Sequence, residues 1–253
     1  MAIVYVLAHF DDEVGCLPMI RRAARAGLDQ RFLYLADYRS PRMAARRLAE
    51  THAALRAEGI GPDRIAHLGL GIEAWDGRLH HALPAAYAAL DAALARIGAV
   101  ERLVSPAWEG GHMDHDMCAL LAVRWSQRKG GLRVEQFPFY SAQGLPFPLL
   151  RAVAPLAANG RRETLALTAA ERRRWLGAAF HYPSQAFAWA GIWPALAWGV
   201  TRHGFGLQRP DPARVDERPH GGPLFYERMF RVPYEEVRAA ADAGLPAPRR
   251  SGG

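Results

Sequence analysis

The sequence predicts an α/β protein: a three-layer, Rossmann-like, doubly wound and mainly parallel sheet with helices on both faces. Two observations predict this class. Short apolar runs alternate with longer segments of helical periodicity from residue 3 to residue 139, an alternation typical of a parallel sheet covered by helices. Half of the 253 residues are hydrophobic and 23% are charged, a composition typical of a soluble globular protein.

Each expected strand is a short apolar run bounded by turn residues. The five runs are residues 3–8, 31–36, 64–70, 101–106 and 132–139. The helices expected between them are residues 14–26, 41–58, 81–97 and 114–129. The second helix has Pro41 in its first turn and Gly59 at its C-terminal cap, which are favoured positions for these residues. We infer the strand order 3-2-1-4-5, in which the first and fourth strands are neighbours.

After Tyr140 the alternation ends and prolines interrupt the chain. We expect a helix from Thr168 or Ala169 to Phe180, a final strand at residues 224–232 and a short helix at 235–241. This C-terminal extension is expected to wrap the sheet and to form one wall of the site. Because no repeat or composition shift marks a second domain, we predict a single domain at residues 1–245. A disordered tail is expected at 246–253.

Two polar clusters follow predicted strands. The run AHFDDE (residues 8–13) follows the first strand, and GHMDHD (residues 111–116) follows the fourth. In the inferred strand order these clusters lie on facing sides of one crevice, where ligands bind in such sheets. Neighbouring carboxylates raise one another's pKa unless a cation lies between them. The clusters therefore predict one divalent metal site, with zinc expected because its catalytic sites use His and Asp or Glu ligands.

The spacing within the clusters suggests which residues share the ion. His9 and Asp12 are close enough in a tight turn to chelate it, and His112 or His115 at a helix start would complete a His-Asp-His set. A remaining carboxylate could take a proton from the attacking water, and a remaining histidine could stabilise an oxyanion. The alternative for either cluster alone is a structural histidine or a carboxylate that caps a helix.

Several function classes are excluded by the sequence. The first turn lacks G-x-G-x-x-G, and its carboxylates would repel a dinucleotide phosphate. The net charge of +7 comes from scattered arginines without aromatic stacking residues among them, so we expect no nucleic-acid partner. Cys16 and Cys118 form no CxxC pair, which argues against a disulfide framework or a thiolate site.

The longest apolar run, residues 186–200, contains Pro194 and is too short to span a bilayer. We expect no transmembrane segment and no signal peptide, and therefore a cytoplasmic protein.

With these two clusters, the sequence resembles the PIG-L/LmbE-like zinc-dependent de-N-acetylases. Their motifs are A-H-P-D-D-E after the first strand and a later H-x-D-H, which stand here as residues 8–13 and 112–115. Weaker similarities are R-x-x-E at residues 47–50 and H-x-S-Q at residues 181–185, with one extra residue. One departure is Phe10 in place of the family's proline. Phe leaves φ unlocked, and we expect its ring at the rim of the site, where it would affect substrate shape rather than metal binding.

The resemblance implies a metal-dependent hydrolase that removes an N-acetyl (or similar acyl) group from an amino sugar, such as an N-acetylglucosaminyl conjugate. A metal-activated water would attack the amide. His9, Asp12 and His115 would be the zinc ligands, with other divalent transition metals as alternatives. The implied partner is a small-molecule N-acetylated sugar conjugate, and a homo-oligomer is compatible with the sequence. The rival functions are a non-catalytic binding protein on the same fold and a phosphoesterase.

The resemblance also implies roles for the other residues of the motifs. Asp11 would be the general base, and His112 the general acid or oxyanion stabiliser. Asp114 would orient His112, and Glu13 would be a supporting residue, hydrogen-bonded to backbone.

Two further residues are substrate-binding candidates. Arg47 could hold a substrate group or form an intrahelical pair with Glu50. Asp37, at the end of the second strand, could bind sugar hydroxyls or cap the next segment. The tryptophans of residues 186–200 could stack on a sugar, although tryptophan more often fills a core.

Overall fold

The computed structural model describes residues 1–245. Its main sheet has seven strands in the order β3-β2-β1-β4-β5-β9-β8. The parallel strands are β1 (Ala2–Leu7), β2 (Gln30–Tyr34), β3 (Ile65–His67), β4 (Val100–Pro106) and β5 (Val134–Phe137). This order confirms the predicted doubly wound topology, and it places the carboxyl ends of β1 and β4 side by side.

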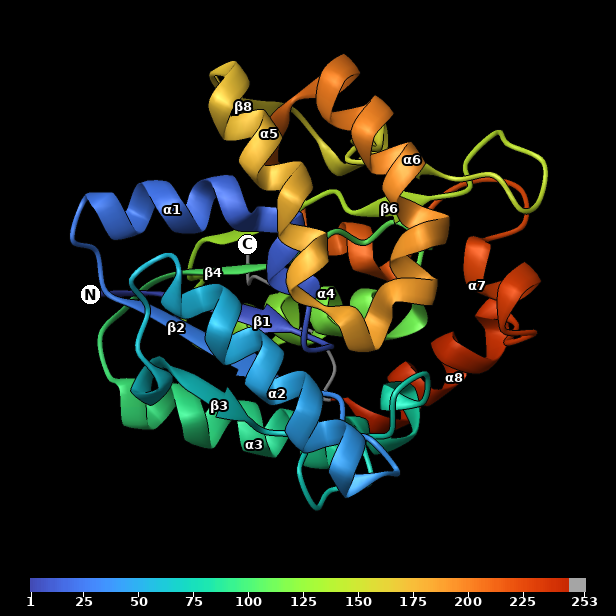
Figure 1. Cartoon of the computed structure of the whole chain (residues 1–253). Coiled ribbons are helices and arrows are strands. Elements are labelled where there is room, and N and C mark those ends of the chain that lie inside the picture. Colours follow the sequence, from blue (N-terminus) through green and yellow to red (C-terminus); the bar gives the residue numbers. More distant parts are fainter. Residues whose placement is uncertain (246–253) are drawn as a thin grey trace.

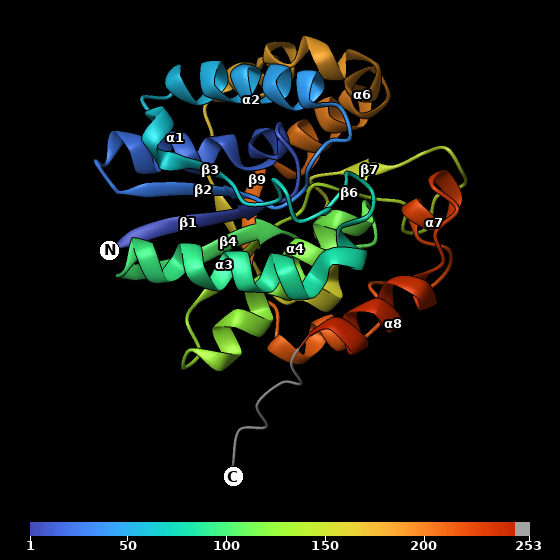
Figure 2. The ribbon, with the colours of Figure 1, turned by 90° about the horizontal axis from the view of Figure 1, so that it is seen from below.

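Helices cover both faces of the sheet (Figures 1 and 2). One face is covered by α1 (Leu17–Arg25), α2 (Pro41–Arg56), α5 (Ala169–Gly177) and α6 (Ala186–His203), and the other by α3 (Leu83–Ile97), α4 (Met113–Arg128) and α8 (Tyr234–Gly244). The side chains of β1 alternate between the two cores: Tyr5 and Leu7 pack with the first group of helices, and Val4 and Val6 with the second. A central parallel strand is apolar throughout because both of its faces are covered.

The C-terminal part adds two antiparallel strands to the sheet. β9 (Phe205–Gln208) pairs with β5, and β8 (Arg162–Leu165) pairs with β9. A separate two-stranded ribbon is formed by β6 (Tyr140–Ser141) and β7 (Arg151–Ala152). α6 and the short α7 (Phe225–Met229) lie near the carboxyl ends of the parallel strands (Figures 1 and 2). They form one wall of the pocket described below, as expected for an extension that wraps the site.

The predicted strand at residues 224–232 is wrong, because this segment contains the helical turn α7. The carboxylate of Glu227 accepts hydrogen bonds from the backbone N–H of Leu224 at 2.7 Å and of Tyr234 at 3.0 Å, which stabilises the turn. A short apolar run does not distinguish a strand from a buried helical turn. The predicted helix at residues 168–180 is α5, which begins after a capping box formed by Thr168 and Glu171 and ends at Gly177.

The Trp-rich stretch is the helix α6, with Pro194 inside it. Within residues 1–245 we find no helix that is both long and apolar enough to cross a membrane. The predicted disordered tail, residues 246–253, lies outside the described residues.

Candidate active site

The two polar clusters meet at the carboxyl ends of β1 and β4. Nε2 of His115, in the first turn of α4, lies 2.9 Å from Oδ1 of Asp12. The ring of His9 lies 4.6 Å from that of His112 and 5.4 Å from that of His115, measured between centroids. His9, Asp12 and His115 are all buried, and their potential ligand atoms lie within 4.8 Å of one another. The neighbouring strands thus bring together residues from two segments far apart in the sequence.

The carboxylate of Asp12 is oriented by backbone N–H groups. Its Oδ2 accepts hydrogen bonds from the N–H of Ala8 at 2.8 Å and of His9 at 2.9 Å. Its Oδ1 therefore faces the imidazoles. Burial alone would raise the pKa of Asp12, but the nearby His115 and His9 hold it well below its ordinary value. Asp12 is a preoriented anion with one oxygen directed at both histidines.

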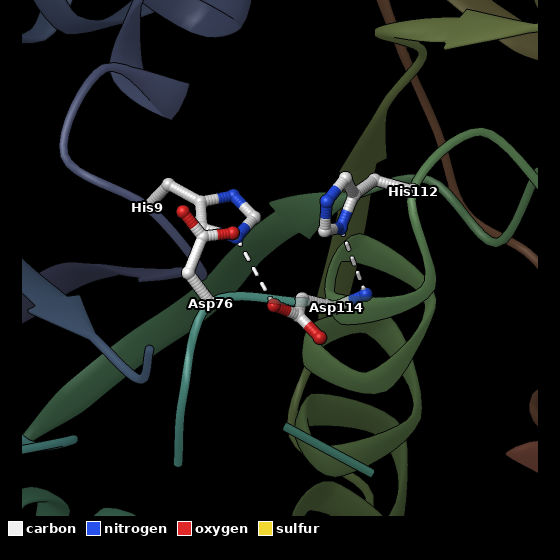
Figure 3. Close-up of side chains that lie close together, drawn as sticks. All are labelled: His9, Asp76, His112 and Asp114. Carbon is white, nitrogen blue, oxygen red and sulfur yellow. Dashed lines mark hydrogen bonds and ion pairs between the residues drawn. The ribbon is translucent and has the colours of Figure 1, made fainter. Parts of the chain in front are cut away.

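Asp114 holds the ring of His9 from the other side (Figure 3). Its Oδ2 lies 3.1 Å from Nε2 of His9, and its two oxygens accept hydrogen bonds from the N–H of Gly77 at 2.7 Å and of Leu79 at 3.0 Å. When Nε2–H of His9 donates to Asp114, the lone pair of Nδ1 is left on the side of Asp12, whose Oδ1 is 3.6 Å away. In the neutral form of His9, Asp114 therefore favours the tautomer with the proton on Nε2, and it orients the ring.

His112 is the N-cap residue of α4. Its Nδ1 accepts a hydrogen bond from the backbone N–H of Asp114 at 3.2 Å. The link between these two residues is therefore a backbone hydrogen bond, whereas the carboxylate of Asp114 contacts His9. An accepting Nδ1 assigns the ring proton to Nε2 in the neutral tautomer. Burial, followed by the positive charge of His9, lowers the pKa of His112 to about 4. The ring is neutral near pH 7 and presents one N–H donor.

Asp11 has an unfavourable backbone conformation, with φ of 133° and ψ of −10°. Non-glycine residues in such regions cost energy and concentrate at functional sites. Its Oδ1 lies 3.2 Å from Nη2 of Arg47, and its Oδ2 accepts a hydrogen bond from Nε1–H of Trp189 at 3.1 Å. Burial raises the pKa of Asp11, the charge of Arg47 offsets part of the rise, and the resulting value is about 7. A carboxylate with this pKa suits proton transfer near neutral pH.

Arg47 is buried and extends from α2 into the site. Its Nη1 lies 3.2 Å from Oδ2 of Asp76, and its guanidinium stacks 4.4 Å above the ring of Tyr38. The intrahelical partner of Glu50 is Arg46, at 3.2 Å, and Arg47 points into the pocket instead. Of the two expected roles of Arg47, this geometry favours binding of a substrate group over the pair with Glu50.

Asp76 is the site residue that the sequence reasoning missed. Its Oδ1 lies 3.2 Å from Nε2 of His9. Burial would raise its pKa, but His9 holds the pKa below the usual range of a carboxyl. No motif marks Asp76. The only available signal was topological, because the loop after β3 reaches the same edge of the sheet.

Glu13 lies behind Asp11. Its Oε2 accepts a hydrogen bond from the backbone N–H of Asp11 at 3.1 Å, and its Oε1 accepts from the hydroxyl of Tyr182 at 2.5 Å. The two weaker motifs also meet, since the N–H of Ser184 donates to Glu50 at 3.1 Å. These contacts tie the C-terminal part of the chain to α2 and to the first polar cluster.

Two residues lie away from their expected positions. Asp37 does not line the pocket; its carboxylate accepts hydrogen bonds from the backbone N–H of Tyr38 at 2.7 Å and of Gly71 at 3.4 Å. It caps local turns, which was its alternative role. The ring of Phe10 is fully buried rather than at the rim, and it lies 4.8 Å from the ring of Tyr34 and 4.9 Å from that of His67.

The site opens into a pocket of about 540 Å³. Its polar side contains His9, Asp11, Asp12, Arg47, Asp76, His112 and His115. Its apolar side contains Phe139, Leu150, Phe187, Ile192, Phe225 and Phe230, among others. Trp189 also lines the pocket, whereas Nε1 of Trp193 donates to the carbonyl of Leu176 and Trp198 is 72% exposed. Of the three tryptophans, Trp189 is therefore the one placed at the site.

Residues 4–126 match the family model described as PIG-L: GlcNAc-PI de-N-acetylase. The match covers just under half of the chain, and this segment is similar to the PIG-L family. The matched segment contains both polar clusters, so the resemblance read from their motifs is confirmed. Among curated proteins, none matches the chain.

Several solved structures share the fold. A deacetylase triple mutant of the teicoplanin biosynthetic pathway has a TM-score of 0.60 and 18% identity, over 83% of this chain and 99% of that one. The N,N'-diacetylchitobiose deacetylase of Pyrococcus horikoshii has a TM-score of 0.58 and 17% identity, over 85% of each chain. The 4-carboxy-2-hydroxymuconate hydratase of Pseudomonas putida has a TM-score of 0.51 and 17% identity, over 82% of this chain and 95% of that one. At these identities the comparison shows the fold, which different reactions share.

Proposed function

We propose that the protein is a metal-dependent hydrolase that removes an N-acetyl or similar acyl group from an amino-sugar conjugate. The observation that carries this proposal is the convergence of His9, Asp12 and His115 on one point beside Asp11, inside a pocket. Two similar structures support the substrate class, since one is a deacetylase of the teicoplanin biosynthetic pathway and the other is an N,N'-diacetylchitobiose deacetylase. Hydration of the kind catalysed by the Pseudomonas protein is the rival reaction.

The donor set fits a divalent ion such as zinc. Asp12 directs one oxygen, and His9 and His115 direct ring nitrogens, toward a shared space, and two nitrogens with one oxygen is a common catalytic zinc set. Asp114 is a poorer ligand, because both of its oxygens already accept backbone hydrogen bonds. We therefore assign His9, Asp12 and His115 as ligands, and Asp114 as the residue that orients His9.

The ion would polarise the amide carbonyl and acidify the attacking water. As the oxygen of this water bonds to the carbonyl carbon, Asp11 accepts one of the protons of the water. Nε2–H of His112 donates a hydrogen bond to the carbonyl oxygen as negative charge develops there. When the C–N bond breaks, the nitrogen takes up the proton held by Asp11. The products are acetic acid and a free amine. The second proton of the water remains on the acid and then passes to the amine or to solvent, which leaves acetate.

The apolar wall of the pocket supports a conjugate with an apolar group attached to the sugar. The wall is formed by α6, α7 and the segment around Phe139, and Phe187 projects from it with 94% of its surface exposed. Apolar surface removed from water contributes about 25 cal/mol per Å² to binding. We expect aryl or alkyl N-acetylglucosaminides to have a higher kcat/KM than the methyl glycoside.

The test is metal content together with acetate release from a panel of N-acetylglucosaminides. Wild-type protein is expected to hold metal and to release acetate. Asp11→Asn keeps the shape of the side chain but not its basicity, so it should retain metal and lose at least a hundredfold in kcat. Asp63→Asn, a surface carboxylate at the opposite end of β3, is the matched control and should change neither. Metal without acetate release from any member of the panel would contradict the proposed reaction.

A further inference from the structure

A second group of potential metal ligands lies outside the pocket. His80 and His81 belong to the 3-10 turn η3 (Leu79–Ala82), and Glu236 belongs to α8, which packs against it. Nε2 of His80 lies 3.5 Å from Oε1 of Glu236, and Nε2 of His81 lies 3.7 Å from the same oxygen. The two rings lie 4.0 Å apart between centroids. All three residues present ligand atoms within 4.8 Å of one another.

His80 is an unusual buried histidine. The residue is only 2% exposed, and within residues 1–245 neither of its ring nitrogens has a hydrogen-bond partner. A buried polar group without a partner costs roughly 1–3 kcal/mol. A metal ion bound by one of these nitrogens would give that nitrogen a partner.

The separations of the three side chains fit a shared ion better than direct hydrogen bonds. Both nitrogen–oxygen distances, 3.5 and 3.7 Å, exceed the usual range of about 2.7–3.2 Å for a hydrogen bond. Two ligands that each lie about 2.1 Å from a tetrahedral zinc ion are about 3.4 Å apart. His81 and Glu236 have side chains that are 47% and 49% exposed, so an ion can enter from solvent and water can complete its coordination.

We propose that His80, His81 and Glu236 form a second divalent-metal site, which takes zinc or a similar transition-metal ion. We call these three residues the α8 metal site. A bound ion would tie α8 to the η3 turn. The same turn supports the first site, because the N–H of Leu79 donates to Oδ1 of Asp114 at 3.0 Å and Asp114 holds His9. The ion would therefore stabilise the turn from which Asp114 is positioned.

The first test counts zinc ions per chain after incubation with zinc alone and removal of the excess by gel filtration. Wild type should retain two equivalents. His81→Ala and Glu236→Gln should each retain one, because the buried His80 is left in place and only exposed ligands change. Glu235→Gln is the matched control, since Glu235 is the neighbouring exposed carboxylate on α8 and pairs with Arg218 at 3.4 Å. This control should retain two equivalents.

A second variant separates the two sites. Asp12→Ala removes a ligand of the first site, so it should retain one zinc, and zinc should still raise its thermal midpoint. The double variant Asp12→Ala/Glu236→Gln should retain no zinc, and zinc should no longer raise its thermal midpoint. Its zinc affinity should be more than tenfold weaker than that of Asp12→Ala.

The outcomes distinguish this proposal from the proposed function. One equivalent in wild type and none in Glu236→Gln would support the α8 metal site and contradict metal binding at the first site. Equal zinc in wild type, His81→Ala and Glu236→Gln would overturn the α8 metal site. Loss of all zinc in Asp12→Ala would also overturn it.

Discussion

Nε1–H of Trp189 donates a hydrogen bond of 3.1 Å to Oδ2 of Asp11, although the two residues are 178 positions apart in the chain. The other oxygen of Asp11 lies 3.2 Å from Arg47. Two helices, α6 and α2, thus supply the donors that set the basicity of one carboxylate. Because donors to an ionised carboxylate lower its pKa, the C-terminal part of the chain contributes directly to the proposed chemistry.

Replacing Trp189 by Phe should move the acidic limb of the kcat/KM profile to higher pH. The variant keeps an aromatic ring but removes the donor, so we expect the pKa of Asp11 to rise by up to about one unit. Activity that requires ionised Asp11 is gained as pH rises through this pKa, so a higher pKa moves the acidic limb to higher pH. Trp193→Phe removes an N–H that bonds to the carbonyl of Leu176, and it should leave the limb in place. A limb that stays in place in Trp189→Phe would show that the bond does not tune Asp11.

Replacing Asp114 by Asn should weaken metal binding at the first site. The variant loses the charged partner of His9, and residues that orient a metal ligand typically contribute about 10–100-fold to affinity. Zinc affinity can be measured by competition with a chromophoric chelator. Asp76→Asn is the comparison, because Asp76 contacts the same nitrogen from a more exposed position and should have a smaller effect. An equal or larger effect of Asp76→Asn would reverse our ranking of the two carboxylates.

Replacing Gly111 by Ala should disturb the loop that carries His112. A Cβ atom at Gly111 would lie 2.0 Å from the carbonyl oxygen of Tyr140, which is far too close for unbonded atoms. Relief of such a clash in a packed site typically costs about 1–3 kcal/mol, visible in urea unfolding, and acetate release should fall as His112 moves. Gly177→Ala, where a Cβ meets no atom within 4 Å, should leave both properties nearly unchanged. Full activity in Gly111→Ala would refute the tight placement of this loop.

Glu109 should make the protein less stable as pH rises. Its Oε1 accepts hydrogen bonds from the N–H of Phe139 at 2.6 Å and of Tyr140 at 2.8 Å, but Oε2 is buried without a partner within residues 1–245. Burial, with a smaller contribution from Asp116, raises the pKa of Glu109 from its ordinary value of 4.5 to about 8. Between these values the folded state binds more protons than the unfolded state, so the free energy of unfolding falls with increasing pH.

Glu109→Gln tests this sign. The decrease in the free energy of unfolding that Glu109 causes is at most about 1.4 kcal/mol per pH unit. It should disappear in the variant, whose amide oxygen still accepts from the loop. Urea unfolding of wild type and of Glu109→Gln from pH 5 to pH 8 provides the comparison, because the two proteins differ in no other side chain. The difference in stability should favour the variant increasingly as pH rises. A constant difference across this range would mean that Glu109 is ionised in the folded protein throughout.

Much of the fold and the meeting of the two polar clusters could be predicted from the sequence, because both depend on local patterns. Apolar runs of strand length that alternate with helical periodicity lead to a doubly wound sheet, and its topology places the ends of β1 and β4 together. The clusters at residues 8–13 and 111–116 were therefore expected to share one crevice before any contact was known. The local pattern gave a wrong prediction at residues 224–232, where a short apolar run contains the helical turn α7 and not a strand.

The tertiary structure alone decided the partners of each side chain. It turned the carboxylate of Asp114 toward His9, placed Asp76 beside the same ring and buried Phe10 beneath the site. It also brought Glu236 of α8 close to His80 and His81. These contacts depend on how loops and the C-terminal helices pack over the sheet. Periodicity determines which face of an element is buried, but it carries no information about which distant atom a polar group will meet there.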